Sequence, residues 1–206
     1  MRRSLCVLVM LAGCKDNGAA ASDPPRPPPR TLAGVYPENW RCESVATLDA
    51  LGALLEGTVK QLDSAASVPR GVPHPCNYEL QTQGLAYWTF DIDCRDGMKQ
   101  RADALFAQYK ATSQDLVHEW NAKADAGAIK PNDSGVDLHA PEPAAEVAVG
   151  AKGLDHHGQG LIFIDDDAPC YVRIVGLDAA RRLEIAKLLA KNLTFANAPM
   201  TPRAFP

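Results

Sequence analysis

The sequence lacks long apolar runs and has no excess of positive charge. Its longest uninterrupted apolar stretch runs from Leu5 to Ala12 and has eight residues, whereas a helix that spans a membrane needs about 20. Lysine and arginine number 21 against 25 aspartates and glutamates, so the formal net charge is −4 at pH 7. These absences argue against a membrane-spanning helix and against a nucleic-acid partner.

The common catalytic motifs are also missing. The sequence contains no G-x-S-x-G nucleophile elbow, no phosphate-binding G-x-x-x-x-G-K-[ST] and no dinucleotide-binding G-x-G-x-x-G. His118 and Glu119 begin the H-E-x-x-H motif of zinc proteases, but Ala122 stands where the motif requires its second histidine. We therefore predict no catalytic residue and favour a protein that is not an enzyme.

The N-terminus has the anatomy of an export signal. Arg2 and Arg3 precede the short apolar run, and small residues follow it. The residues Leu11-Ala12-Gly13-Cys14 resemble the lipobox of bacterial lipoproteins. In that family a peptidase cuts before a cysteine whose sulfur carries a diacylglycerol. The resemblance implies that residues 1–13 are a signal peptide and that Cys14 is the lipidated first residue. The alternative is an ordinary signal peptide cut elsewhere, with Cys14 free.

The resemblance also implies a cellular location and attachment to a membrane. Burial of each lipid CH₂ group contributes about 0.8 kcal/mol, so the two or more chains on a lipoprotein cysteine hold firmly. Lys15, where an aspartate signals retention at the inner membrane, favours the outer membrane of a bacterial envelope. The side of exposure, periplasm or surface, stays open. We expect no cofactor beyond the covalent lipid on Cys14, which includes palmitate-like chains.

The mature chain is predicted to be one domain on a tether. Removal of residues 1–13 takes two arginines and no acidic residue, so the formal charge falls from −4 to −6. Residues 14–33 include five prolines between Pro24 and Pro29, a composition typical of an extended tether. We predict a single domain over residues 34–198 and an irregular tail over residues 199–206.

Four cysteines remain in the predicted domain, and an even number in an exported protein indicates disulfides. No pair has C-x-x-C spacing, which argues against a structural zinc site. Four cysteines allow three pairings. We expect Cys76–Cys94, which flank a predicted hairpin, and Cys42–Cys170, which would join the two ends of the domain.

Apolar periodicity predicts an α+β fold with a mostly antiparallel small sheet and three to four helices. Ser44 is a suitable N-cap for the first helix, and the second is either one long helix or two that meet near Ser113. In the second strand, alternation places Trp88, Phe90, Ile92 and Cys94 on the core side. Strands cluster without regular β-α-β alternation, which favours α+β. The predicted helices cover residues 44–62, 97–126 and 178–193, and the predicted strands cover residues 78–81, 85–94, 145–151, 160–165 and 170–176.

Two loops carry candidate metal ligands. If the strand over residues 160–165 pairs with the one before it, histidines and carboxylates could share one loop edge and bind a transition metal. The candidates are His156, His157, Asp165 and Asp167. The alternative is a Gly-rich hairpin loop and a solvated acidic turn. On the last helix, we interpret Arg181, Arg182, Lys187 and Lys191 as a solvated face.

Three functional hypotheses follow from these features. The first is a membrane-anchored envelope lipoprotein that binds a protein or another envelope component, or has a structural role, without catalysis. The second is a metal-dependent binder or enzyme that uses His156, His157 and residues Asp165–Asp167. The third is an immunity or inhibitor lipoprotein, because anchored acidic domains can neutralise toxins that act on the envelope.

Overall fold

The computed structural model describes residues 32–81, 85–128, 140–156 and 158–204. Backbone contacts divide the chain into a unit over residues 1–30 and a unit over residues 31–206, and every described element lies in the second. The predicted signal peptide, Cys14 and most of the predicted tether lie outside the described residues. The helices are α1 (Leu48–Leu55), α2 (Met98–Asp125) and α3 (Ala179–Asn192). The strands are β1 (Leu32–Ala33), β2 (Thr58–Leu62), β3 (Cys76–Gln81), β4 (Leu85–Asp93), β5 (Ala145–Val147), β6 (Lys152–His156), β7 (Gly160–Ile164), β8 (Tyr171–Val175) and β9 (Arg203–Ala204).

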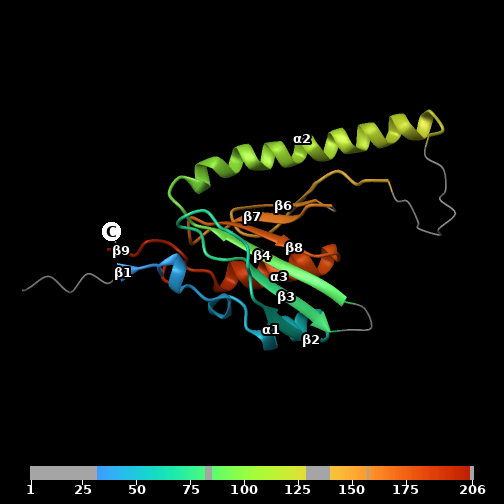
Figure 1. Ribbon diagram of the computed structural model, residues 1–206. Helices are drawn as coiled ribbons and strands as arrows, with labels where there is room; N and C mark the ends of the chain where they lie inside the picture. The colour runs from blue at the N-terminus through green and yellow to red at the C-terminus, as the bar shows by residue number, and fades with distance from the viewer. Residues whose placement is uncertain (1–31, 82–84, 129–139, 157, 205–206) are drawn as a thin grey trace, which may run out of the picture. The chain divides into compact units, whose positions relative to one another are not determined.

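Seven of these strands form one sheet in the order β2-β3-β4-β8-β7-β6-β5, with every neighbouring pair antiparallel. Two meanders, β2–β4 and β5–β8, meet where β4 pairs with β8. Figure 1 shows α1 and α3 on one side of this sheet and α2 on the other. The predicted α+β class with an antiparallel sheet is confirmed, although the sheet is larger than we expected.

The face toward α1 and α3 holds the larger apolar cluster. In β4, Trp88 and Phe90 are buried on this face, as alternation predicts. Leu161 and Phe163 of β7 and Ile174 of β8 pack into the same cluster, and none is more than 1 % exposed. Burial of this apolar surface stabilises the fold by roughly 25 cal/mol per Å² removed from water.

The face toward α2 is covered by a smaller cluster. Phe106 of α2 packs with Leu154 of β6 and with Ile162 and Ile164 of β7. The helix is continuous, so the alternative of two helices meeting at Ser113 is wrong: this buried side chain donates to the Lys110 carbonyl and accepts from the Ala144 amide. Beyond it the helix is mostly exposed, and it ends before Gly127, whose φ of +66° is the left-handed conformation with which glycine commonly terminates a helix.

All four predicted disulfide cysteines are paired, but the expected pairing is wrong. The disulfides are Cys42–Cys76 and Cys94–Cys170, with Cα–Cα distances of 5.8 and 4.1 Å. Asp93 lies opposite Tyr171 in the β4–β8 ladder, so one further step brings Cys94 next to Cys170. Proximity along the chain suggested the hairpin pairing, whereas the long-range pairing of β4 with β8 decides it.

Two predicted elements differ from the structure. The helix predicted over residues 44–62 is only Leu48–Leu55, with Thr47 as its N-cap, and the chain then turns at Glu56 (φ 55°) into β2. Strand β2 gains a ladder with β3, which buries Val59 opposite Leu80. Of the strand predicted over residues 145–151, only β5 (Ala145–Val147) is a strand, and β6 (Lys152–His156) lies in a segment for which we predicted none.

The folded unit also includes residues that we assigned to the tether and to the tail. Strand β1 pairs with β9, and both Ala33 and Met200 are buried. Gly34 has a φ of +90°, and a Cβ there would lie 2.8 Å from Met200 Cγ, so a larger residue does not fit. No helix among the described residues is long and apolar enough to cross a membrane.

Candidate binding pocket between helix α2 and the sheet

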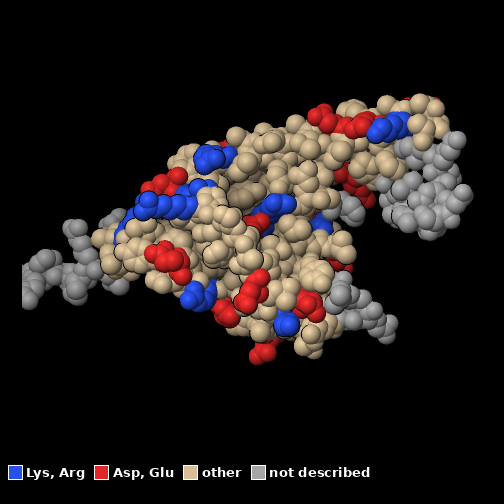
Figure 2. All heavy atoms as spheres, viewed as in Figure 1, with Lys and Arg blue, Asp and Glu red and all other residues tan. Residues whose placement is uncertain are grey.

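A pocket of about 480 Å³ lies between the loop over residues 66–75, the first three turns of α2 and the adjoining ends of β4 and β8. This volume is in the range that small-molecule sites occupy. Its lining combines an apolar wall with a charged floor, and Figure 2 shows basic and acidic atoms side by side below α2. These two parts come from different segments of the chain.

The apolar wall comes from the loop and from α2. Val72 and Pro73 of the loop face the pocket together with Met98 and Leu105 of the helix. Met98 is only 5 % exposed, and Leu105 is half-buried and reaches the cavity. Three prolines between residues 69 and 75 restrict the backbone of the loop, which lowers the entropy lost when a ligand orders it.

The floor consists of side chains that alternate with the apolar core residues of the same strands. Because Phe90 and Ile92 are buried toward α1 and α3, Asp91 and Asp93 of β4 lie on the α2 side. In the β4–β8 ladder Asp91 is opposite Arg173, and Asp93 is opposite Tyr171. The ladder therefore places two carboxylates, a guanidinium and a phenol on one small area.

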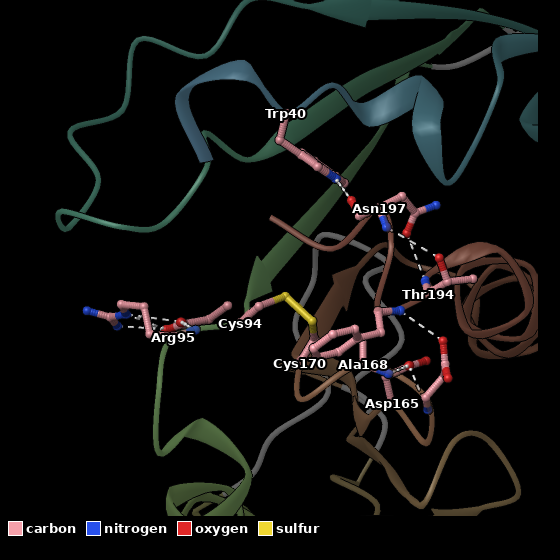
Figure 3. Close-up of a disulfide and its surroundings, with 11 residues drawn as sticks. Trp40, Cys94, Arg95, Asp165, Ala168, Cys170, Thr194 and Asn197 are labelled. Atoms are coloured by element: carbon pink, nitrogen blue, oxygen red, sulfur yellow. Dashed lines mark hydrogen bonds and ion pairs between the residues drawn. A yellow bond between two sulfur atoms is a disulfide. The ribbon is translucent and has the colours of Figure 1, made fainter. Parts of the chain in front are cut away.

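Asp93 and Arg95 form a bidentate ion pair with each other. The carboxylate accepts from Arg95 Nε at 3.0 Å and from Arg95 Nη2 at 2.6 Å, and its Oδ1 also accepts from the Arg95 backbone N–H at 3.1 Å. Such a fork is the strongest pairing geometry for these groups. Figure 3 shows Arg95 of this pair next to the Cys94–Cys170 disulfide.

Asp91 and Tyr171 have shifted protonation equilibria. Burial raises the pKa of the Asp91 carboxyl, and the positive charge of Arg173 opposes that rise. Burial also raises the pKa of the Tyr171 hydroxyl, and the neighbouring Tyr109 adds to the rise. Tyr171 therefore stays neutral at physiological pH.

Two of the three arginines in the pocket form no ion pair among the described residues. Arg173 donates from Nε to the Gln159 carbonyl at 3.4 Å, and its Nη atoms have no hydrogen-bond partner there. Arg101 is exposed and lines the pocket, and its side chain has neither an ion pair nor a hydrogen bond within that part of the chain. The lining thus carries three arginines against two aspartates, although the whole chain is acidic.

The Cys94–Cys170 disulfide supports the floor from beneath. Cys94 stands between Asp93 and Arg95 in the chain, and Cys170 directly precedes Tyr171. Both cysteines are at most 1 % exposed. The bridge therefore fixes the ends of β4 and β8 at the place where their side chains line the pocket.

The candidate metal ligands do not converge. His156 lies opposite Gly160 at the hairpin end of β6 and β7, whereas Asp165 follows β7 at its far end, about 16 Å along the strand. The expectation that both loops share an edge is therefore wrong. His157 is outside the described residues, within which no group of three or more His, Cys, Asp or Glu residues is placed to hold a metal ion.

These residues have local partners instead. The Nδ1 atom of His156 accepts from the Gly158 amide at 3.2 Å, and its ring lies edge-on to the Tyr109 ring. Asp165 accepts from the Ala168 amide at 2.7 Å and from the Asp167 amide at 3.1 Å. The Asp167 carboxylate accepts from the Phe195 amide at 2.8 Å. Both aspartates thus fold the turn between β7 and β8 and attach it to the segment after α3.

Sequence reasoning also missed a buried ion pair. Arg182 is fully buried, and its Nε and Nη2 donate to the two Asp155 carboxylate oxygens at 2.8 Å each. Its Nη1 donates to the Gly176 carbonyl at 2.6 Å. The interpretation of Arg182 as part of a solvated helix face is therefore wrong, because β6 brings Asp155 beneath α3.

The pocket itself carried only a weak signal in the sequence. Its residues come from separate segments that share no motif, so no spacing rule finds them. The one available sign was the parity of Asp91 and Asp93 within a strand whose other face is apolar. Comparisons with protein-family models, with curated proteins and with solved structures find no match to this chain.

Proposed function

We propose that this chain is a lipid-anchored binding protein of a bacterial envelope, and that its domain binds a small envelope component in the pocket below α2. The observation that carries the proposal is the pocket itself, which places an apolar wall over a charged floor. Sites with this composition use apolar area for affinity and a few polar groups for orientation. The lining offers paired charges and phenols rather than an activated nucleophile beside a base.

Two further features support an exported location. The lipobox-like residues Leu11–Cys14 favour lipidation. All four cysteines of the domain are in disulfides, which is the state expected outside the reducing cytosol.

The anchor is tested by Cys14→Ser in the expressing bacterium. We expect the wild-type protein to incorporate labelled palmitate and to sediment with outer-membrane fractions, and the variant to lose both properties. Unchanged membrane association of the variant would contradict the anchoring part of the proposal.

The pocket is tested by filling it. Leu105→Trp adds a large side chain at the pocket wall, and Leu116→Trp makes the same change on an exposed part of the same helix. Both are made in the full chain carrying Cys14→Ser, which is screened by thermal shift against a library of small envelope metabolites. We expect Leu105→Trp to abolish ligand-induced shifts and Leu116→Trp to retain them. Equal shifts in both variants would place ligand binding elsewhere.

A further inference from the structure

We propose that the pocket selects a small organic carboxylate with an apolar body, whose acid group is held by Arg101 and Arg173. The inference rests on the proposed binding function and adds the chemical class of the ligand. It follows from which charged groups of the pocket are already engaged, which are available, and where the apolar wall stands relative to them.

The charge of the pocket has the opposite sign to that of the protein. Asp93 is neutralised by Arg95 through the fork described above. Arg101, Arg173 and Asp91 remain, which leaves an excess of one positive charge in a chain whose formal charge is −4. A local excess of positive charge in a partly dry cleft favours an anion over a neutral or cationic ligand.

The available guanidinium groups suit a carboxylate. Arginine presents a planar fork of N–H donors that matches two carboxylate oxygens. Arg173 is half-buried on the floor, where its Nε is held by the Gln159 carbonyl and its Nη atoms have no partner among the described residues. Arg101 lines the same pocket from α2, is exposed, and has a side chain without a partner within the same residues. One guanidinium is thus bonded through its Nε and half-buried, and the other is exposed at the same pocket.

Asp91 opposes the anion and makes the inference testable. Its carboxyl faces Arg173 across the ladder, and its burial disfavours the charged form. A bound carboxylate competes with Asp91 for the Arg173 guanidinium. Replacement of Asp91 by asparagine removes this competitor while it retains a polar group of similar size.

The apolar part of the pocket lining determines which chemical groups the rest of the ligand carries. Val72 and Pro73 of the loop and Met98 and Leu105 of α2 offer apolar surface. The Tyr109 ring also lines the cavity, and aromatic rings favour another ring in edge or offset contact. These contacts fit a ligand with a ring-sized apolar body a few bonds from its acid group.

The experiment is isothermal titration calorimetry on the full chain carrying Cys14→Ser. The probes are 4-phenylbutyrate and the neutral 4-phenyl-1-butanol, which share the apolar body and differ in charge. We expect the acid to bind about tenfold more tightly than the alcohol, since hydrogen bonds to a charged group are the stronger ones. Equal binding of the two probes would overturn the inference, and so would the absence of binding by both.

Charge variants then assign the acid-binding residues. Arg101→Gln and Arg173→Gln are each expected to weaken 4-phenylbutyrate binding by roughly three- to tenfold and to leave 4-phenyl-1-butanol binding unchanged. Lys99→Gln is the matched control, because Lys99 is exposed on the same helix and does not line the pocket. Asp91→Asn should tighten phenylbutyrate binding. Arginine variants that bind both probes as Lys99→Gln does would contradict the assignment.

Two additional experiments distinguish failure of the proposed ligand class from failure of the proposed binding function, and identify the source of the carboxylate. Alcohol binding that Leu105→Trp abolishes, without any preference for the acid, would leave the proposed binding function intact and refute the anion class alone. An N-acetylated tripeptide ending in phenylalanine, with a free or an amidated C-terminus, identifies the source of the carboxylate. Preference for its free acid over phenylbutyrate would assign the ligand to a peptide end, and the reverse order to a small acid.

Discussion

The two faces of the central sheet are built from alternate residues of the same strands, yet they differ in chemistry. In β4, Trp88 and Phe90 pack toward α1 and α3, whereas Asp91 and Asp93 lie toward α2. Along β4, the side chains on the first face are apolar and buried, and those on the second are charged and line a pocket. One strand thus contributes to stability with one set of side chains and to the candidate site with the other.

The difference has an energetic meaning. Charged and polar groups that are half-buried below α2 stabilise folding little, because their desolvation costs offset their interactions. The face toward α1 and α3 must therefore supply most of the stability that keeps the pocket in place. The Cys94–Cys170 disulfide contributes both to the stability of the fold and to the geometry of the pocket, because it is buried and joins the two strands of the pocket floor.

The largest expected effect comes from a matched pair of phenylalanine truncations. Phe163→Ala removes a fully buried ring from the cluster facing α1 and α3, and we expect the free energy of unfolding to fall by about 4 kcal/mol. Phe106→Ala removes a ring from the smaller cluster under α2, with an expected loss of about 3 kcal/mol. Urea denaturation measures both. A larger loss for Phe106→Ala would contradict the assignment of the main core.

Next comes the buried ion pair on the face toward α3. Arg182→Met leaves the Asp155 carboxylate without its partner, and we expect a loss of about 3 kcal/mol by urea denaturation. The neighbouring Arg181→Met removes a surface pair with Glu56, and the expected loss is below about 1 kcal/mol. If the two variants lose the same stability, the pair of Arg182 is not buried as the structure shows.

A smaller effect concerns the turn after β7, where Asp165 is fully buried and burial raises its pKa to about 6. In the unfolded chain an aspartate titrates near 3.9, so between these values only the unfolded state loses its proton. Stability contributed by this group therefore falls as the pH rises from about 4 to about 6. Asp165→Asn lacks this dependence.

Thermal melts of Asp165→Asn and wild type across that interval check the expectation. The Tm of the variant minus that of the wild type should increase from about pH 4 to about pH 6 and then level off. A difference that stays constant with pH would show that the Asp165 carboxyl titrates normally in the folded protein.

The sequence predicted best what depends on local pattern. Helix α3, the extent of α2 and the buried side of β4 follow from periodicity, although periodicity leaves open whether α2 is one helix or two. Strand β2 was missed because its apolar spacing also fits a helix, and only its pairing with β3 decides between them.

What could not be predicted depends on contacts between distant segments. The Cys94–Cys170 pairing and the Asp91–Arg173 juxtaposition both arise where β4 meets β8, two strands separated by more than 70 residues. Arg182 has the same spacing as its exposed neighbours on α3, and only the β6 carboxylate beneath it explains its burial. No local signal in a single sequence carries that information.

The central claim is that the α2 face of the sheet, and not the face toward α1 and α3, binds a ligand. Backbone chemical-shift mapping of the ¹⁵N-labelled full chain with Cys14→Ser, titrated with 4-phenylbutyrate, tests it most directly. We expect the largest shifts in residues 66–75, in the first three turns of α2 and around Asp91 and Arg173. Shifts concentrated in α1 and α3, or none at saturating probe, would contradict the claim.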